Sequence, residues 1–358
     1  MPVYKNKDNG TWYVMTQYTD WKGERKPKCK RGFATKREAQ DWEQKFQQQS
    51  SGDLDMPFSA FVEIYCKEQK PRLKESTWQT KENIIQQKIL PYFKDRKINE
   101  ITTKDVRAWQ NEMLAYRNEE NKPYSSSYLK TLHNQLSAIF NYAVRFYDLR
   151  SNPASKAGNM GSEERKEMLF WTKEEYQKFS EVMMDKPLSY YAFQMLYWTG
   201  IREGELLALT PADFDFEKGT VKISKTYQRL KGQDVITSPK TKKSNRTVQM
   251  PDFLCTEIQE FFGMQYGLKK KDRVFTVTKS YLHHEMDRGA KEAGIKRIRI
   301  HDLRHSHISL LIDMGFSAVA IADRVGHESI EITYHYAHLF PSKQKEMAVK
   351  LDFMNKGV

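Results

Sequence analysis

The sequence predicts a multidomain α+β protein, and three observations support this fold class. The chain has 358 residues, more than one ordinary hydrophobic core accommodates, so two or three domains are expected. Hydrophobic residues make up 39% of the chain, which is enough for each domain to fold. The spacing of apolar residues changes along the chain, from strand-like to helical and then to a mixture. We therefore expect a small β-sheet with a helix, then a helical bundle, then a mixed, mainly helical domain with a small β-sheet.

Residues 1–50 contain the first predicted sheet and its helix. In TWYVMTQYTD, Val14 and Thr16 fall on one face of a strand while Tyr13 and Met15 fall on the other, and KCKRGFAT has the composition of a second strand. The stretch TKREAQDWEQKFQQQ has helical spacing. It begins with a threonine that is followed three residues later by glutamate, which matches a capping box.

The same segment concentrates positive charge. Its candidate DNA contacts are Lys26, Lys28, Lys30 and Arg31. A small sheet with basic and aromatic side chains can enter a DNA groove. The alternative is a solvated hairpin, which would have the same composition.

Residues 56–155 are predicted to form a helical bundle. Four stretches have helical spacing: PFSAFVEIYCKEQ, STWQTKENIIQQKILPYF, TTKDVRAWQNEMLAYRN and SSSYLKTLHNQLSAIFNYAVRFYD. Thr102 or Thr103 is a candidate cap of the third helix. Between the first two helices lie further candidates for contact with DNA phosphates, namely Lys70, Arg72 and Lys74. The alternative is that these cations are only solvated.

Proline, glycine and charged residues interrupt the periodicity in SNPASKAGNMGSEERKE, which predicts a linker at 151–167. Residues 168–358 form the last predicted domain. Thr172 and Glu175 match a capping box, and SYYAFQMLYWTG has the apolar content of a buried helix that ends at Gly200. GTVKISKTYQ and NRTVQMP are predicted strands.

Charge and cysteine content narrow the class of protein. The formal net charge is +13, which is typical of proteins that meet a polyanion, above all nucleic acid. The three cysteines are far apart and form no CxxC motif, which argues against a disulfide framework or a zinc–thiolate site and fits a reducing cytosol. MPVYKNKDNG lacks the apolar core of a signal peptide, and no apolar run is long enough for a membrane span. We therefore expect a cytoplasmic protein with no membrane partner.

The first polar cluster of the last domain is TGIREGELLAL. Arg202 follows a glycine where a helix is predicted to begin, and Glu205, three residues on, can hold its guanidinium in position. A surface ion pair with the same spacing would contribute little. The pair follows an apolar helix rather than lying on a charged face, which favours a functional role.

The second cluster, HDLRHSH at 301–307, raises the question of a metal site. His301 and Arg304 would lie one turn apart at a helix N-terminus, where backbone N–H groups favour an anion. His305 and His307 are predicted to point elsewhere, because adjacent positions share no face. His301 and His305 have the spacing of metal ligands, but Arg304 stands between them and no acidic cluster surrounds them. A phosphate is therefore favoured over a metal ion.

The third cluster is RVGHESIEITYHYAHLF. Gly326 is predicted to end one helix, and Ser329 to cap a short helix that contains Tyr334 and Tyr336. His327 lies between the two helices. A tyrosine near two arginines is a candidate nucleophile for phosphate, because the arginines neutralise the anion that it must approach. Taken alone, such a tyrosine is more often a half-buried packing residue.

Taken in order, GIREGE, HDLRH, GHES and HYAHLF resemble the tyrosine recombinase (phage integrase) family. The resemblance covers the whole chain, because phage and conjugative-transposon integrases have an arm-binding domain, a helical core-binding domain and a catalytic domain. It implies these catalytic residues: Arg202, Lys240, His301, Arg304, His327 and Tyr336, with Glu205 in support. Tyr336 is preferred over Tyr334 because of its YAH context. Within SPKTKKSNRTVQM, Lys240 matches the family's hairpin lysine best, and Lys242 stays open as an alternative.

The resemblance implies a site-specific DNA recombinase that needs no metal, nucleotide or other cofactor. The two arginines would clamp the scissile phosphate, with a hydrogen bond from His327. Tyr336 would attack while His301 accepts its proton, and the product would be a 3′-phosphotyrosyl link. Lys240 would protonate the leaving 5′-oxygen.

The implied partners are double-stranded DNA, at core and arm sites, and other copies of the chain. The tail PSKQKEMAVKLDFMNKGV has apolar residues that would pack either on a neighbouring subunit in a homotetramer or on its own domain. An accessory directionality factor is a further implied partner, and the implied setting is a bacterial cytoplasm. Two alternatives stay open: a type IB topoisomerase-like strand transferase and a non-catalytic DNA-binding regulator. The arm-like domain favours recombination over the first, and the filled family positions argue against the second.

Overall fold

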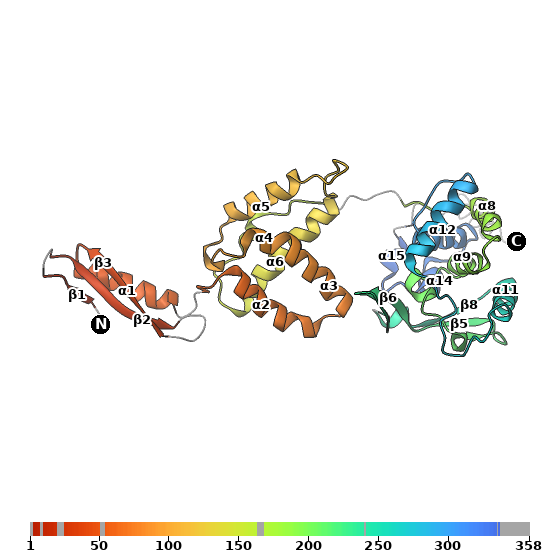
Figure 1. Ribbon diagram of the computed structural model, residues 1–358, viewed down its shortest axis with the longest axis horizontal. Helices are drawn as coiled ribbons and strands as arrows, with labels where there is room; N and C mark the ends of the chain where they lie inside the picture. The colour runs from red at the N-terminus through yellow and green to blue at the C-terminus, as the bar shows by residue number, and fades with distance from the viewer. Residues whose placement is uncertain are drawn as a thin grey trace, which may run out of the picture. The chain divides into compact units, whose positions relative to one another are not determined.

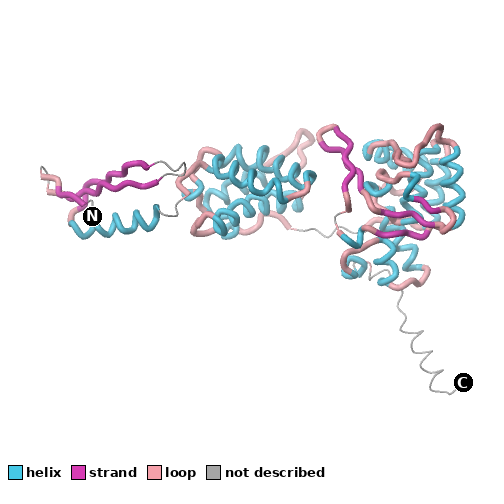
Figure 2. The backbone as a smooth tube through the Cα atoms, turned by 90° about the horizontal axis from the view of Figure 1, so that it is seen from below, coloured by secondary structure: helices cyan, strands magenta, loops and turns pink. Residues whose placement is uncertain are grey.

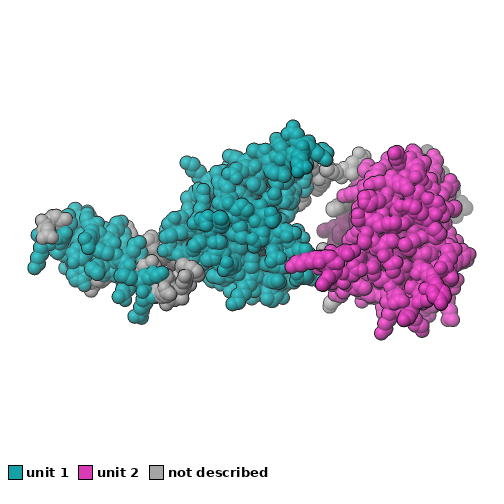
Figure 3. Space-filling model, in the orientation of Figure 1, with its two compact units in different colours: residues 1–166 teal, residues 167–358 magenta. Residues whose placement is uncertain are grey.

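The computed structural model consists of two compact units, Met1–Lys166 and Glu167–Val358 (Figure 3). It describes residues 3–7, 10–19, 25–50, 54–162, 168–239, 241–334 and 336. Across these residues, no helix combines the length and the apolar character that a membrane span requires. Small sheets accompany many helices, so the predicted multidomain α+β class is confirmed.

The described part of unit 1 begins with a three-stranded antiparallel sheet that packs on one helix (Figure 1). The elements are β1 (Val3–Lys5), β2 (Trp12–Thr19), β3 (Arg25–Phe33) and α1 (Lys36–Ser50). Val14 is fully buried and Met15 is 50% exposed, which confirms the predicted alternation of β2. The Glu38 backbone N–H donates to Thr35 Oγ1 at 3.1 Å, which starts α1 near the predicted cap. Strand β1 was not predicted, because three residues are too few to establish a period.

The four predicted helices of the bundle are present in unit 1. They are α2 (Phe58–Gln69), a helical run that begins with α3 (Glu75–Ile84), α5 (Thr103–Ala115) and α6 (Ser126–Phe146), joined by the short turns η1 (Lys70–Arg72) and η3 (Ile98–Glu100). Thr102 and Asp105 form the capping box of α5. Phe58, Trp109 and Phe140 are fully buried and belong to one core cluster.

The second predicted helix of the bundle is not uniform. After α3 the chain passes through a π-helical turn, η2 (Ile85–Ile89), and then α4 (Leu90–Phe93). Pro91 has no N–H to donate, so the regular helical hydrogen-bond pattern cannot continue through it, and the π-turn lies directly before this break.

The predicted linker at 151–167 is wrong over its first half. Residues Pro153–Ala157 form α7, and the Asn152 side chain accepts the Ser155 N–H at 3.0 Å to cap it. Ala154 is fully buried in the core of the bundle. A short capped helix that contains proline and serine has the composition of a linker, so the sequence alone did not separate the two.

Unit 2 is mainly helical around two small β-structures, which Figure 2 shows as separate groups of strands. Its described helices are α8 (Lys173–Met183), α9 (Pro187–Thr199), α10 (Glu203–Leu206), α11 (Asp252–Gly263), α12 (Lys279–Glu292), α13 (Asp302–Asp313), α14 (Ala318–Val325) and α15 (Ile330–Tyr334). One sheet has the order β4 (Phe214–Asp215), β5 (Thr220–Ile223), β8 (Arg246–Gln249), and a hairpin consists of β6 (Thr226–Leu230) and β7 (Gln233–Thr237). Two short 3₁₀ turns, η4 (Pro211–Asp213) and η5 (Lys242–Ser244), complete the described elements.

Helix α9 lies in the centre of unit 2 and ends as predicted. Most of its residues are buried, and Gly200 follows it in the left-handed region with φ 66°. A Cβ at Gly200 would lie 2.5 Å from His307 Cδ2, so only glycine fits this close approach. The predicted capping box of Thr172 and Glu175 also starts α8.

The predicted single strand GTVKISKTYQ is wrong, because it is divided between two β-structures. Its first part is β5, which pairs with β8, and its second part is β6, which pairs with β7. Both halves have strand composition, and nothing in the local pattern marks the change of partner.

Candidate active site

Glu205 joins two arginines at the start of α10. Its Oε1 accepts from Arg202 Nη1 at 2.7 Å, and its Oε2 accepts the Arg202 backbone N–H at 2.9 Å. The predicted support of Arg202 by Glu205 is therefore present. The carboxylate side chain is 3% exposed and the Arg202 side chain 37%, so this is not a surface ion pair.

Arg246 is a second arginine bonded to Glu205, and it was not predicted as a site residue. It lies at the first position of β8, and its guanidinium donates to both carboxylate oxygens at 3.0 and 3.3 Å. Burial alone would raise the pKa of Glu205, but Arg246 and Arg202 hold it below its ordinary value. The carboxylate is therefore ionised, and the three groups together have a net positive charge.

Arg304 projects from the first turn of α13 and is almost fully buried. It donates to two backbone carbonyls, Gly200 O at 2.8 Å and Val325 O at 2.6 Å. Burial and the charges of Arg202 and Arg246 lower its pKa to about 9, which leaves it protonated at neutral pH. The ends of α9 and α14 thus fix the direction of this guanidinium.

His301 is the N-cap residue of α13, as predicted, and it is exposed to solvent. Part of its surface is open to solvent, but neighbouring protein atoms desolvate the ring, and this effect, followed by the nearby His305 and Arg304, lowers the pKa of His301 to about 4. The imidazole is therefore neutral at pH 7 and available as a hydrogen-bond acceptor.

Tyr336 is buried, with 3% of its surface exposed, and its hydroxyl hydrogen-bonds to His305 Nδ1. The prediction that His305 points elsewhere is therefore wrong. Positions 301 and 305 are four apart and share one face of α13, and their rings lie 5.2 Å apart between centroids. The short helix α15 ends at Tyr334, so Tyr336 lies just beyond it rather than within it. Tyr334 is 54% exposed.

His327 follows Gly326, which ends α14 in the left-handed region as predicted. Its Nδ1 lies 2.8 Å from the hydroxyl oxygen of the fully buried Thr333, a contact that fixes the ring. Burial, and then Arg304 and Arg202, lower the pKa of His327 to about 3, so the ring is neutral. His307 is buried and accepts a hydrogen bond from Arg324 Nε at 3.0 Å.

A cavity of about 250 Å³ opens beside this cluster in unit 2. Its lining includes Arg202, Glu205, Thr226, Ser244 and Gly326. The lining presents a guanidinium and hydroxyl groups, which can bind phosphate oxygens, together with the carboxylates of Glu205 and Glu328.

Two predicted elements of the site lie outside the described residues. One is Lys240, and the other is the C-terminal tail from residue 337 onward. The alternative Lys242 begins the turn η5, and only its backbone is described.

The candidate DNA contacts of the first sheet divide between its two faces. Lys28 pairs with Thr16 and Lys30 with Val14, so both share the face that packs on α1. Lys30 Nζ lies 5.1 Å from the centroid of a Trp42 ring on that helix. Lys26, opposite Tyr18, belongs to the same side by register.

Arg31 lies on the other face of the sheet. It pairs with Tyr13, and its guanidinium carbon is 5.8 Å from the tyrosine ring centroid. The half-exposed Met15 lies on this face, which α1 leaves open. In the bundle, the remaining candidates Lys70, Arg72 and Lys74 lie at or beside η1 and are all exposed.

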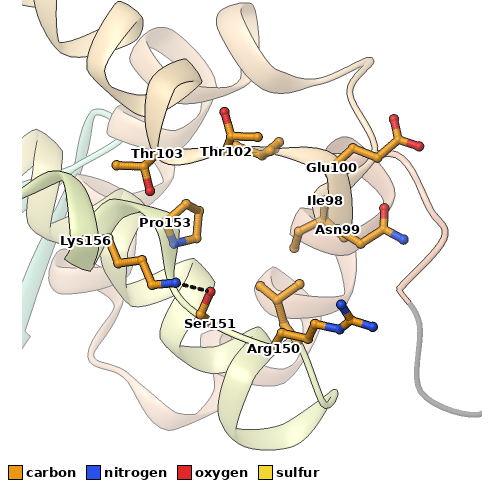
Figure 4. Close-up of a pocket in the computed structure, with 11 residues that line it drawn as sticks. Ile98, Asn99, Glu100, Thr102, Thr103, Arg150, Ser151, Pro153 and Lys156 are labelled. Carbon is orange, nitrogen blue, oxygen red and sulfur yellow. Dashed lines mark hydrogen bonds between the residues drawn. The ribbon is translucent and has the colours of Figure 1, made fainter. Parts of the chain in front are cut away.

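A larger cavity of about 530 Å³ lies within unit 1, where the start of α5 meets the start of α7 (Figure 4). Lys156 Nζ points toward Ser151 and donates a hydrogen bond to its Oγ at 3.1 Å. Arg150 and Glu100 also line it. Among its described lining residues there is no imidazole, thiol or phenol, so the groups suited to tyrosine chemistry lie in unit 2.

Comparison with known families matches three segments of the chain. Residues 170–343 match the phage integrase family, residues 57–114 match the phage integrase N-terminal SAM-like domain, and residues 2–50 match an arm DNA-binding domain. The order of the three segments agrees with the order of the sheet, the bundle and the mixed domain.

Relatives in the same family match most of the chain or a large part of it. The ICEBs1 integrase of Bacillus subtilis (strain 168) is 30% identical over 339 residues, which cover 89% of this chain and 90% of the relative. A XerC-like tyrosine recombinase of Caldanaerobacter subterraneus subsp. tengcongensis is 30% identical over 258 residues, which cover 63% of this chain and 66% of that protein.

Solved structures have the same fold at lower identity. The Tn1549 transposon integrase in complex with transposon right end DNA superposes with a TM-score of 0.67 at 18% identity, covering 84% of this chain and 100% of that one. A lambda integrase dimer bound to a COC′ core site gives 0.61 at 17% identity, with 94% of each chain covered. The sequence match over 89% of the chain, together with the matching family domains and the shared fold, establishes that this protein belongs to the phage integrase family of tyrosine recombinases and is a site-specific DNA recombinase.

Proposed function

We propose that the protein cuts and rejoins DNA with Tyr336 as its nucleophile, through a 3′-phosphotyrosyl intermediate. The observation that supports this choice is the burial of Tyr336 with its hydroxyl on His305, close enough to Arg304 for that charge to act on its pKa. The exposed Tyr334 has no comparable surroundings. A phenol needs both a proton acceptor and a nearby cation before it can attack a phosphodiester at neutral pH.

Arg202 and Arg304 are the proposed clamp for the two non-bridging oxygens of the scissile phosphate. Arg304 keeps further N–H groups after donating to Gly200 and Val325, and Arg202 is partly open to the cavity. His327 is proposed to donate a hydrogen bond to the phosphate. His301 adds a neutral imidazole on the solvent side. Planar, permanently charged guanidiniums suit this task, because they stabilise the charge that grows during attack.

The proposed step conserves the number of phosphorus–oxygen bonds. The Tyr336 oxygen bonds to phosphorus while the bond to the 5′-oxygen breaks and its electron pair leaves with that oxygen. Lys240 is the proposed proton donor to the leaving group, with Lys242 as the alternative. Because the new link is again a phosphodiester, a 5′-hydroxyl from a second duplex can reverse the step and complete recombination.

For the rest of the chain we propose three domains: an arm-binding domain at 1–50, a core-binding domain at 56–155 and a catalytic domain at 168–358. The first sheet would bind arm sites, and Lys70, Arg72 and Lys74 would contact phosphates near the core site. Complexes of Tn1549 and lambda integrases with DNA support double-stranded DNA as the partner. A lambda integrase tetramer on a Holliday junction supports a homotetramer on DNA. Exchange of C-terminal tails and an accessory directionality factor belong to the same proposal.

A trapping experiment tests the proposed nucleophile. The protein is incubated with a nicked suicide duplex that spans the joined ends of its mobile element, and covalent protein–DNA adducts are separated on a denaturing gel. The wild type and Tyr334→Phe should form the adduct, and Tyr336→Phe should not while still binding the duplex. An adduct with Tyr336→Phe would refute the assignment. Strand exchange between two duplexes distinguishes recombination from simple relaxation of supercoils.

A further inference from the structure

We infer that His305 takes the proton of Tyr336 during attack, and that Asp302 is the positioning residue that prepares His305 for this step. The inference rests on the proposed role of Tyr336 as nucleophile. It gives His305 the task that the family resemblance assigns to His301.

The contact between His305 and Tyr336 is direct. The phenol oxygen meets His305 Nδ1, and the two rings lie 5.5 Å apart between centroids. Among the hydrogen bonds of the described residues, none joins His301 to Tyr336. The group already bonded to the phenol is therefore the one that can receive its proton without a rearrangement.

Asp302 determines which nitrogen of His305 is free to accept. Its Oδ1 lies 3.6 Å from His305 Nε2, one helical turn away on α13. A neutral imidazole has one N–H, and a carboxylate beside Nε2 favours that proton on Nε2. The lone pair of Nδ1 then faces the phenol O–H. The same logic orients the histidine of a carboxylate–imidazole–hydroxyl triad.

Asp302 is itself held firmly. It is 1% exposed, its Oδ2 accepts the Arg299 backbone N–H at 2.8 Å, and its Oδ1 accepts from Arg299 Nη2 at 2.8 Å. Both contacts fix the carboxylate at the N-terminal end of α13. A fixed carboxylate stabilises the imidazolium as it forms and needs no reorganisation at that moment.

The protonation states suit a transfer from phenol to imidazole. Burial raises the pKa of Tyr336 to about 12, so free phenolate is scarce. Burial also lowers the pKa of His305, with Asp302 opposing part of this shift, so the imidazole is neutral and able to accept. Transfer within the hydrogen bond avoids a separated phenolate in a buried site.

The proposed step exchanges one phosphorus–oxygen bond for another and moves one proton to His305. The Tyr336 O–H bond breaks, its proton goes to His305 Nδ1, and the oxygen electron pair forms the new bond to phosphorus. The bond from phosphorus to the 5′-oxygen breaks, and that oxygen leaves with the electron pair and takes a proton from the proposed lysine. In the reverse reaction a 5′-hydroxyl attacks, and Nδ1 returns its proton to the tyrosine oxygen.

The test uses the full-length His305→Asn variant, because the asparagine amide can still accept a hydrogen bond but cannot take a proton. His284→Asn, at an exposed position of α12, is the matched control. Rates of adduct formation are measured on two suicide duplexes, one ordinary and one with a bridging sulfur in place of the scissile 5′-oxygen. A sulfur leaving group needs no proton. The sulfur duplex should therefore restore the cleavage rate of variants that lack the general acid, but not of variants that lack the general base.

We expect His305→Asn to lose about 100-fold or more in rate on both duplexes, a typical loss for a general base, with DNA affinity unchanged. Lys240→Ala should be slow on the ordinary duplex and recover on the sulfur duplex. A His305→Asn rate within threefold of wild type, or its recovery on the sulfur duplex, would overturn the inference.

A pH profile tests Asp302 and covers the case in which His305→Asn does not fold. The charged and titratable groups around His305 are Asp302, Arg299, Arg304, His301, His327 and Tyr336. Removing the negative neighbour in Asp302→Asn should lower the pKa of His305, so the acid limb of the rate should move to lower pH. If the acid limb of the pH–rate profile did not move, the proposed role of Asp302 in positioning His305 would be contradicted. If the proposed function itself were wrong, Tyr336→Phe would still form the adduct, whatever the rate of the position 305 variants. This outcome is distinct from a failure of the inference about His305.

Discussion

At the scale of single residues, the charge of Glu205 affects the net charge that Arg202 presents to the cavity. With Arg202 alone, the buried carboxylate would neutralise the guanidinium that faces the cavity. Arg246 supplies a second positive charge through two hydrogen bonds, and its own side chain is 7% exposed. One positive charge therefore remains for the ligand.

Arg246→Gln should lower both strand cleavage and stability. Removing one partner of a buried ion pair typically costs about 3–5 kcal/mol, and urea unfolding measures this loss. Arg297→Gln is the control, since its pair with Asp287 is exposed at 43% and 56%, and loss of such a surface pair should cost less than about 1 kcal/mol. Equal losses in the two variants would contradict the role of Arg246.

His307 should make the stability of unit 2 sensitive to mild acid. Burial, and then Arg324, lower its folded-state pKa to about 3, whereas the pKa of an unfolded histidine is about 6.5. Between these two pKa values the unfolded state binds more protons than the folded state. The free energy of unfolding is therefore highest above the unfolded pKa and falls as the pH decreases below it, by up to about 1.4 kcal/mol per pH unit. Urea unfolding at several pH values should show a smaller slope for His307→Gln. The exposed His284→Gln should keep the wild-type slope.

At the scale of elements, the end of α9 connects the fold to the site. Gly200 provides the left-handed turn, and its carbonyl oxygen accepts from Arg304. The position of the Arg304 guanidinium, one half of the proposed phosphate clamp, therefore depends on a helix end that the sequence predicts.

Gly200→Ala should destabilise unit 2 and slow cleavage. The new Cβ would meet His307 at 2.5 Å in a conformation that alanine rarely adopts, and we expect a loss of more than about 1 kcal/mol. Gly263→Ala, at the end of α11, is the matched control. A Cβ there meets nothing within 4 Å, so the thermal midpoint should stay the same or rise. A neutral effect of Gly200→Ala would contradict the packing argument.

Elements with strong local signals were predicted, and those decided by distant partners were not. Capping boxes at Thr102 and Thr172 and the glycine after α9 act within a few residues, so the sequence contains the whole signal. The π-turn before Pro91 depends on how the rest of the bundle packs around an irregular helix. The division of one predicted strand into β5 and β6 depends on their distant partners, β8 and β7.

The same distinction applies to the site residues. Motif order picked out the residues at the starts of α10 and α13, and Arg202, Arg304 and Glu205 do lie near one another. Arg246 was missed because a lone arginine on a strand looks like a surface cation. His305 was misplaced because adjacency to Arg304 outweighed its four-residue spacing from His301.

At the scale of the whole molecule, a net charge of +13 predicts DNA binding that weakens steeply with salt. The sheet of unit 1 narrows the surface that can meet DNA, because α1 covers one of its two faces. Arg31 and Tyr13 lie on the open face, and Lys28 lies on the side of the helix.

Arg31→Ala should weaken binding to an arm-site duplex more than Lys28→Ala does. We expect about a tenfold loss for Arg31→Ala, in the range of a single specific contact. Fluorescence anisotropy over a range of salt concentrations measures both variants, and a lost phosphate contact would also reduce the salt slope by about 1. A larger loss for Lys28→Ala would mean that the helix side of the sheet faces the DNA.

The burial of Tyr336 among Ile308, Ile312, Ile321 and Val325 also bears on the safety of the host genome. An enzyme that diffuses along a chromosome meets far more unrelated duplex than target. The proposed nucleophile, packed among these apolar side chains, would be shielded from those encounters, and accidental nicks in unrelated DNA would then be rare.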